Sequence, residues 1–521
     1  MSGPSPEQMG IAGEQTSQPK ESRPVALDKE RYEQLKDALH WDAYGFFNGD
    51  AKHRTAEFDK MLADKSGEYI PTLDYPDLEP GSEQMQKIEH WSSILREARN
   101  EIREQNPQAR EIMATGWEEN DDPDEQTVVD VAYLLKINEK IAETELVKAA
   151  ARGDMKSFER MSGFIYGEPS PEIFQWTVDR MRARMKALTS IYDDPEMHEV
   201  AQELLADLPE KTGVKTAEVF PLLDKDTFKS MQKDLEKQFD LALQLVERTE
   251  PVLIDMPPDK RENYTISPQS QRDMVTSLLE AGAGPSYTAE IIPGRTGYFV
   301  NVQKKVVEIP DKRELNLKDF RVKVIHEVLT HVYRRTKGTE SDLMLLGVGL
   351  KGYDEGEEGV ASFRERLARG EQKIFFLPIG HFAIGLARGV DGKKRNPRQV
   401  HRTLSNFLTL QNYYLGKGKK SIPEARKRAD IVARGTTIRT FRGTDGKTPG
   451  VCLTKDIIYT EGRSKLYRKL KQLGGKATAY SRIFNWGKFD AGDSRGGMLA
   501  FGILRRLPAY DKQMKELGIA A

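Results

Sequence analysis

The chain has 521 residues, of which 38% are hydrophobic and 31% are charged, so it can bury a sizeable core beneath a well-solvated surface. Its single cysteine, Cys452, excludes a disulfide framework and a cysteine-rich zinc module. The sequence contains no stretch of about 18 apolar residues and no secretory signal, so we expect a cytoplasmic protein without a membrane span.

The formal net charge of −1 conceals an uneven distribution of charge along the chain. Residues 1–300 sum to −23, whereas residues 301–521 sum to +22. Two interpretations are open at this stage. The two halves could neutralise each other in the fold, or the basic half could present a positive surface to an acidic partner.

Residues 1–28 are rich in Ser, Pro, Gln, Glu and Gly, which is typical of a disordered tail. Apolar residues at helical spacing then predict an N-terminal helical region over 29–126, with a long amphipathic helix at 83–105. The acidic run 117–126 contains proline, which is typical of a loop or a domain boundary. Further helices follow it, including a long amphipathic one at 225–248.

The pattern changes at 297–310, GYFVNVQKKVVEIP, which is β-rich and bounded by glycine and proline. It predicts a pair of strands or one long strand. Asn316 is placed to cap the helix that follows, and more helical segments come after it. The sequence therefore predicts an α+β fold that is mostly α-helical and has a small sheet.

The motif His326-Glu327-Val-Leu-Thr-His331 lies on the helix that Asn316 begins. Imidazole suits zinc, and a carboxylate beside the first ligand is placed to accept a proton from a metal-bound water. The spacing is one residue longer than in His-Glu-x-x-His, and five α-helical residues end about 140° away from the starting direction. A single π-type bulge between the histidines would bring them back to one face. Two half-buried structural histidines are the plainer alternative.

A third ligand would complete a catalytic zinc site, with water at the fourth position. The acidic run YDEGEE at 353–358 offers carboxylates for this role. The same acids could instead stabilise an exposed helix N-terminus through its dipole.

Together these segments resemble the microtubule-associated tyrosine carboxypeptidase family and its bacterial relatives, which are named for a Gln-Glu-Gly-Leu-Ala motif. The resemblance rests on the histidine motif, on LLGVGLKGYD and on EEGVA. It implies a zincin-like metallopeptidase core, with zinc held by His326, His331 and Glu358 and with Glu327 as the catalytic glutamate.

The resemblance covers about 130–490, so we expect a catalytic domain over 127–490 and a C-terminal segment over 491–521. Two positions depart from the family motif: Glu357 replaces its glutamine and Val360 its leucine. These departures leave the expected ligands in place and bear on substrate specificity.

A carboxypeptidase also needs a cation to hold the terminal carboxylate of its substrate, and arginine is preferred because it binds in a bidentate manner. The candidates are Arg388, Arg442 and Lys455. The strand that contains Asn301 offers an edge along which an extended peptide can pair. We therefore expect a peptide or protein C-terminus as substrate, and the family resemblance implies that the residue removed is tyrosine. An acidic tail would suit a positive cleft. We expect no nucleic-acid or membrane partner.

Two alternatives remain open. The chain could be a zinc endopeptidase or amidohydrolase of another specificity, or it could be a helical binding protein that retains a relic metal site.

Overall fold

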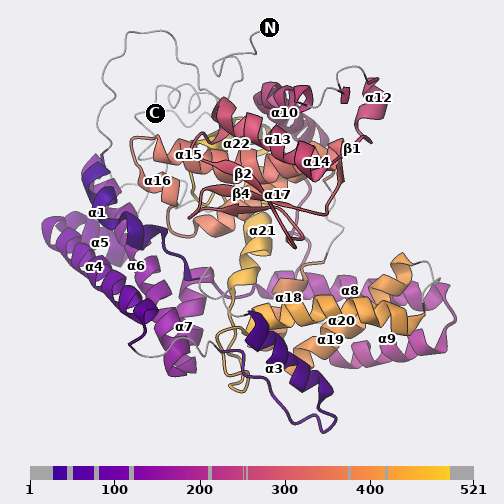
Figure 1. The fold of residues 1–521 in the computed structure, drawn as a ribbon. Coiled ribbons are helices and arrows are strands. Elements are labelled where there is room, and N and C mark those ends of the chain that lie inside the picture. The colour runs from indigo at the N-terminus through magenta and orange to yellow at the C-terminus, as the bar shows by residue number, and fades with distance from the viewer. Residues whose placement is uncertain are drawn as a thin grey trace.

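A computed structural model describes residues 27–43, 51–74, 81–116, 123–208, 214–249, 252–253, 256–372, 377–416 and 421–492 (Figure 1). The fold is mostly α-helical and contains two small sheets, which confirms the predicted class. The predicted tail lies outside the described residues except at 27–28, and so does the C-terminal segment from 493 onward. Among the described residues, no helix has the length and apolar character needed to cross a membrane.

The N-terminal helices lie along one side of the molecule (Figure 1). They are α1 (Lys29–His40), α4 (Glu83–Gln105), α5 (Pro107–Thr115), α6 (Glu125–Arg152) and α7 (Met155–Tyr166), whereas α3 (Ala51–Ala63) lies apart from them. The bounds of α4 match the prediction, because Ser82 caps its first turn by accepting a hydrogen bond from Met85 N. The expected domain border at 126 falls at the start of α6, which packs against α4, α5 and α7.

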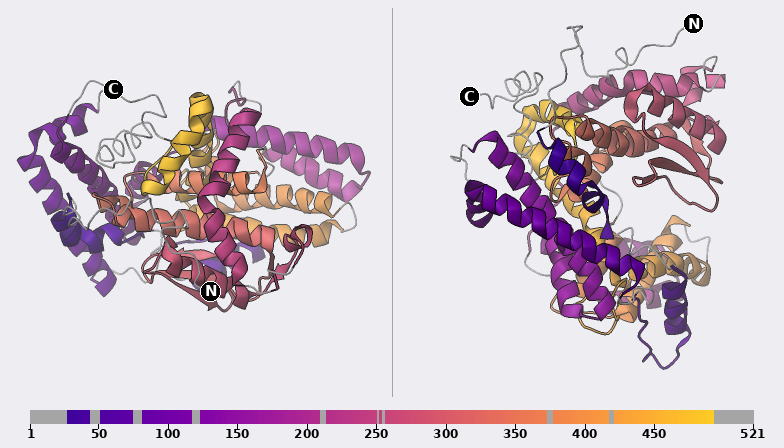
Figure 2. Two further views of the ribbon diagram at one scale, coloured as in Figure 1. Left: turned by 90° about the horizontal axis from the view of Figure 1, so that it is seen from above. Right: turned by 60° about the vertical axis from the view of Figure 1, so that its left-hand side comes forward.

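A second group of helices forms a separate lobe with its own apolar core (Figures 1 and 2). It consists of α8 (Pro171–Ile191), α9 (Pro195–Asp207), α18 (Ile379–Arg388), α19 (Pro397–Leu415) and α20 (Ile422–Phe441). Cys452 is fully buried in this core, as expected for a small apolar residue. The α3 helix packs on the outside of this lobe against α20.

The remaining elements form the lobe that carries the sheets, and they share their core with α1 and with α4–α6. Its helices are α10 (Lys225–Arg248), α12 (Pro258–Arg261), α13 (Pro268–Leu278), α14 (Leu317–His326), α15 (Tyr333–Thr339), α16 (Leu345–Val348), α17 (Tyr353–Arg369) and α22 (Ala477–Arg482). Its strands are β1 (Thr265–Ile266), β2 (Thr288–Ile292), β3 (Phe299–Asn301), β4 (Val306–Pro310) and β5 (Leu315–Asn316).

The predicted strand pair is confirmed as the antiparallel hairpin β3–β4, in which Val300 pairs with Val307. Strand β2 was not predicted; it pairs in parallel with β4 and places Ile291 beside Ile309. The order is β2-β4-β3, so the buried strand β4 is central and β3 lies at an edge. A short β1–β5 ladder leads into α14, whose predicted cap is confirmed because Asn316 accepts a hydrogen bond from Asp319 N.

Helix α21 (Ile458–Leu473) runs between the two lobes and crosses α17 at close range (Figure 1). The contact depends on glycine. A Cβ atom on Gly462 would lie 1.8 Å from the carbonyl oxygen of Glu355, and one on Gly359 would lie 2.6 Å from the carbonyl oxygen of Gly462. The two backbones are therefore closer than any side chain at these positions would allow.

Part of the uneven charge of the sequence is matched by ion pairs between its two halves. Basic residues after position 300 pair with acidic residues before it: Arg388 with Glu159 and Glu168, Arg398 with Asp64, Arg402 with Asp207, Arg434 with Asp59, Lys471 with Glu218 and Arg482 with Asp234. These pairs support the interpretation that the halves neutralise each other.

We expect Gly462→Ala to lower the free energy of unfolding by about 2–3 kcal/mol, because the added methyl group overlaps the α17 backbone. Gly435→Ala in α20 is the control, since a Cβ there meets nothing within 4 Å and removing a helical glycine should stabilise by about 0.5–1 kcal/mol. Urea unfolding of both variants would test this, and an equal effect of the two substitutions would contradict the close crossing.

Candidate metal centre

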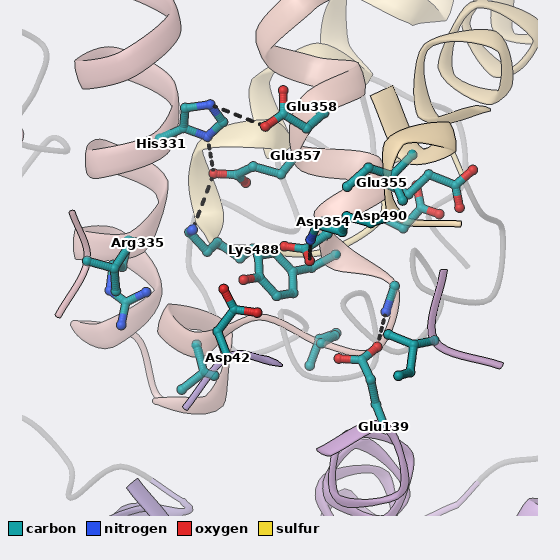
Figure 3. Close-up of a pocket in the computed structure, with 18 of the residues that line it drawn as sticks. Asp42, Glu139, His331, Arg335, Asp354, Glu355, Glu357, Glu358, Lys488 and Asp490 are labelled. Carbon is teal, nitrogen blue, oxygen red and sulfur yellow. Dashed lines mark hydrogen bonds and ion pairs between the residues drawn. The ribbon is translucent and has the colours of Figure 1, made fainter. Parts of the chain in front are cut away.

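A cavity of about 1360 Å³ lies where the N-terminal helices, the sheet lobe and α21 meet. Its walls include the end of α1, one side of α6, the edge strand β3, the histidine motif, the start of α17 and the segment around Lys488. Figure 3 shows that His331 and Glu358 face each other across one end of it. All three motif residues, His326, Glu327 and His331, line this cavity.

The histidine motif lies on a helix that changes its winding between the two histidines. Helix α14 ends at His326, a π-helical turn spans Glu327–Val332, and α15 begins at Tyr333. The hydroxyl of Thr330 donates to the carbonyl of Ile325, five residues earlier, at 2.7 Å. We call residues 317–339 the motif helix.

The π turn confirms the bulge considered from the spacing, because a π turn uses more residues per revolution than an α turn. It brings the rings of His326 and His331 to the same face, with centroids 4.9 Å apart. One ligand atom from each of His326, Glu327 and His331 lies within 4.8 Å of the others, and this group could hold a metal ion. Glu358 reaches it from α17, with Oε1 3.9 Å from Nε2 of His331.

Each histidine has one ring nitrogen close to a carboxylate outside this group, and for His331 the contact is a hydrogen bond. Nδ1 of His331 lies 2.9 Å from Oε1 of Glu357, and Nδ1 of His326 lies 3.0 Å from Oε1 of Glu365. Both Nε2 atoms are therefore left for the centre. A carboxylate behind each imidazole is the arrangement that fixes ring orientation and raises ligand basicity in metal sites.

Glu357 is itself anchored by buried cations. Arg334, which is fully buried, binds its other oxygen, and Nζ of Lys488 lies 3.5 Å from Oε1. Burial raises the pKa of Glu357, but Arg334 and Lys488 outweigh it and hold the pKa well below the usual range. The carboxylate behind His331 is therefore ionised.

The charge at this end of the cavity favours a bound cation. Burial lowers the pKa of His326, yet the carboxylates of Glu365, Glu327 and Glu358 together raise it to about 9. A divalent metal would satisfy the same excess of negative charge. The donor set of two imidazoles and two carboxylates fits such an ion chemically.

The four residues expected to bind substrate fall into two groups. Lys455 and Asn301 line the cavity, where Lys455 pairs with Asp354 at 2.6 Å and Asn301 donates to Glu308 at 3.0 Å. Arg388 and Arg442 are not among the residues that line it. Arg388 is bound to acidic residues of the α7 segment, and Arg442 is buried 3.8 Å from Asp456.

The roles of Glu357 and Glu365 behind the histidines were not predicted from the sequence. A signal for Glu365 was present, because it follows Glu358 by seven residues on one helix and so lies two turns along the same face. Comparison of the chain with known protein families, curated proteins and solved structures finds no match.

We expect Glu365→Gln to weaken the binding of a divalent metal roughly 10- to 100-fold, because His326 loses the charge behind its ring. Glu371→Gln is the control, since Glu371 pairs with Arg366 at the end of α17 and does not line the cavity. Competition with a chromophoric chelator would measure both affinities. Unchanged affinity in the Glu365 variant would mean that the contact with His326 does not support a ligand.

Proposed function

We propose that this protein is a zinc-dependent metallopeptidase that removes a residue from the C-terminus of a protein or peptide. The observation that supports this most is the π turn, which directs two imidazoles and Glu327 to one point of a large cavity. The resemblance of the histidine motif and the EEGVA segment to the tyrosine carboxypeptidase family supports the same class and suggests tyrosine as the residue removed.

Zinc is the metal we propose, because it takes imidazole and carboxylate ligands and keeps an open position in catalytic sites. His326 and His331 would hold it through Nε2, and Glu358 would be the third ligand. The helix that carries the motif lies against a small sheet, whose edge strand β3 pairs only with β4 within the described ranges, and this arrangement supports a zincin-like core.

Bound zinc would supply an acidified water and polarise the carbonyl of the scissile peptide bond. Glu327 would accept the proton of that water at its carboxylate and return it to the leaving amine. Glu357 and Glu365 would keep the two imidazoles oriented and basic throughout the reaction.

The edge strand β3 would align the substrate. Residues 298–303 line the cavity, and β3 contacts the π turn of the motif helix. An extended peptide can add to a free sheet edge through main-chain hydrogen bonds, which would bring its scissile bond beside Glu327.

We expect Glu327→Gln to retain zinc and to lose about 10²- to 10⁴-fold in kcat, because the amide cannot accept the proton. Retention of zinc would also show that Glu327 acts as a proton acceptor and is not needed as a zinc ligand. Glu340→Gln is the control, since Glu340 pairs with Lys337 on the surface of the same helix. Metal analysis and peptide assays of both variants test this, and a purified wild-type protein that binds no zinc would refute the proposal.

The exopeptidase activity can be separated from an endopeptidase or amidase activity with one pair of substrates. We expect a peptide that ends in a free carboxylate to be shortened by one residue, and the same peptide with an amidated C-terminus to be cleaved at least 10-fold more slowly, because its terminal charge is gone. Mass spectrometry of the products gives both results. Equal cleavage of the two peptides, or cleavage at internal bonds, would favour the endopeptidase.

A further inference from the structure

The cations that line the cavity differ in whether a carboxylate neutralises them. Five are paired with an acidic side chain: Lys140 with Glu143, Arg295 with Glu308, Lys455 with Asp354, Lys465 with Glu355 and Lys488 with Glu357. A sixth, Lys351, lies over the ring of Phe164 at 4.7 Å. The charges of the five paired cations are therefore already satisfied within the protein.

Arg335 is different. Its guanidinium bonds to Nδ1 of His40 at the end of α1, and within the described part of the chain no carboxylate lies within 4.0 Å of it. Figure 3 shows Arg335 reaching into the cavity from the motif helix, with no ion pair drawn to the labelled acids around it. Among the cavity cations described, Arg335 and Lys351 are the two that a ligand could neutralise without first breaking an ion pair, and of these two Arg335 lies on the motif helix.

His40 holds Arg335 without neutralising it. Burial, aided by Arg335 and Lys140, lowers the pKa of His40 to about 3, so the imidazole is uncharged at neutral pH. Its second nitrogen, Nε2, lies 2.8 Å from the hydroxyl of Tyr32. A neutral acceptor occupies one N–H of the guanidinium and orients the group, and the remaining donors can bind a carboxylate in a bidentate manner.

The position of Arg335 suits the last residue of a peptide. It follows His331 by four residues, so it lies on the same side of the motif helix and about 6 Å further along the axis. One extended residue spans about 3.3–3.6 Å, and the guanidinium contributes further reach. A peptide whose final peptide bond lies at the histidines would therefore place its terminal carboxylate within reach of Arg335.

We propose that Arg335 is the receptor for the C-terminal carboxylate of the substrate and thereby limits the protein to the ends of chains. This inference rests on the proposed peptidase function and assigns a residue to its specificity. It replaces Arg388, Arg442 and Lys455 in that role, because two of them lie outside the cavity and the third is paired with Asp354.

Binding to an inactive protein tests the inference without catalysis. The probe is an N-terminally labelled hexapeptide ending in tyrosine, prepared as the free acid and as the amide, and titrated against zinc-loaded Glu327→Gln protein by fluorescence anisotropy. We expect the acid to bind roughly 10- to 100-fold more tightly than the amide, since its carboxylate gains hydrogen bonds to a charged partner.

Adding Arg335→Met should remove this preference by weakening the acid while leaving the amide unchanged. Arg335→Lys, which keeps one charge and loses the bidentate fork, should give an intermediate preference. Lys351→Met is the matched control, a cavity cation that stacks on Phe164, and should keep the full preference. Circular dichroism and zinc content identify any variant that has not folded.

A preference for the acid over the amide that survives Arg335→Met overturns the inference. Equal binding of acid and amide to the protein that retains Arg335, or no binding of either, overturns it as well. A purely structural role for Arg335 would weaken acid and amide alike and overturns it as well. Hydrolysis by the wild-type protein is measured separately. An inactive wild type that still prefers the acid would count against the peptidase alone, and an active one without preference against Arg335 alone.

Discussion

The buried carboxylate of Glu357 holds together the parts of the chain that form the candidate metal centre. It is bound by Arg334 from the motif helix, by Lys488 from the segment after α22 and by Nδ1 of His331. Arg334 also donates to the carbonyls of Gly487 and Phe489. Breaking a buried pair of this kind leaves an uncompensated charge and costs about 3–5 kcal/mol. The network therefore fixes α17 against the motif helix, and this brings Glu358 toward Nε2 of His331.

Charge is arranged at two scales around this network. Ion pairs link the acidic and basic halves of the chain. Some lie within a lobe, as Arg402–Asp207 and Arg482–Asp234 do, and Arg388–Glu159 joins two helical groups, so the basic half does not present a uniformly positive cleft. Within the cavity most cations are likewise paired. When most charges in a site are paired within the protein, the few unpaired charges determine which ligand binds. The surroundings of Arg335 therefore matter more for ligand selection than the net charge of its half of the chain.

Local signals explain how much of the fold could be predicted. The amphipathic periods of α4 and α10, the cap at Asn316 and the hairpin at 297–310 depend on residues close together in sequence, and each was predicted near its observed bounds. Strand β2 was missed because TAEII is short and becomes a strand only through pairing with β4. The sequence pattern around Arg388 and Arg442 could not show that they lie outside the cavity. The partner of Arg388 is on a distant segment, and Arg442 is buried near Asp456.

The sequence by itself determined the chemistry available at the site. Two histidines five residues apart beside a glutamate require a change of helical winding if they are to meet, and the π turn supplies it. The tertiary structure alone decided which carboxylates lie behind the imidazoles and which of the described cavity cations have no carboxylate partner. Those assignments depend on the distances between α1, α17, the motif helix and the segment around Lys488. The packing of side chains that are far apart in sequence sets these distances, so they cannot be predicted from a periodic pattern along the chain.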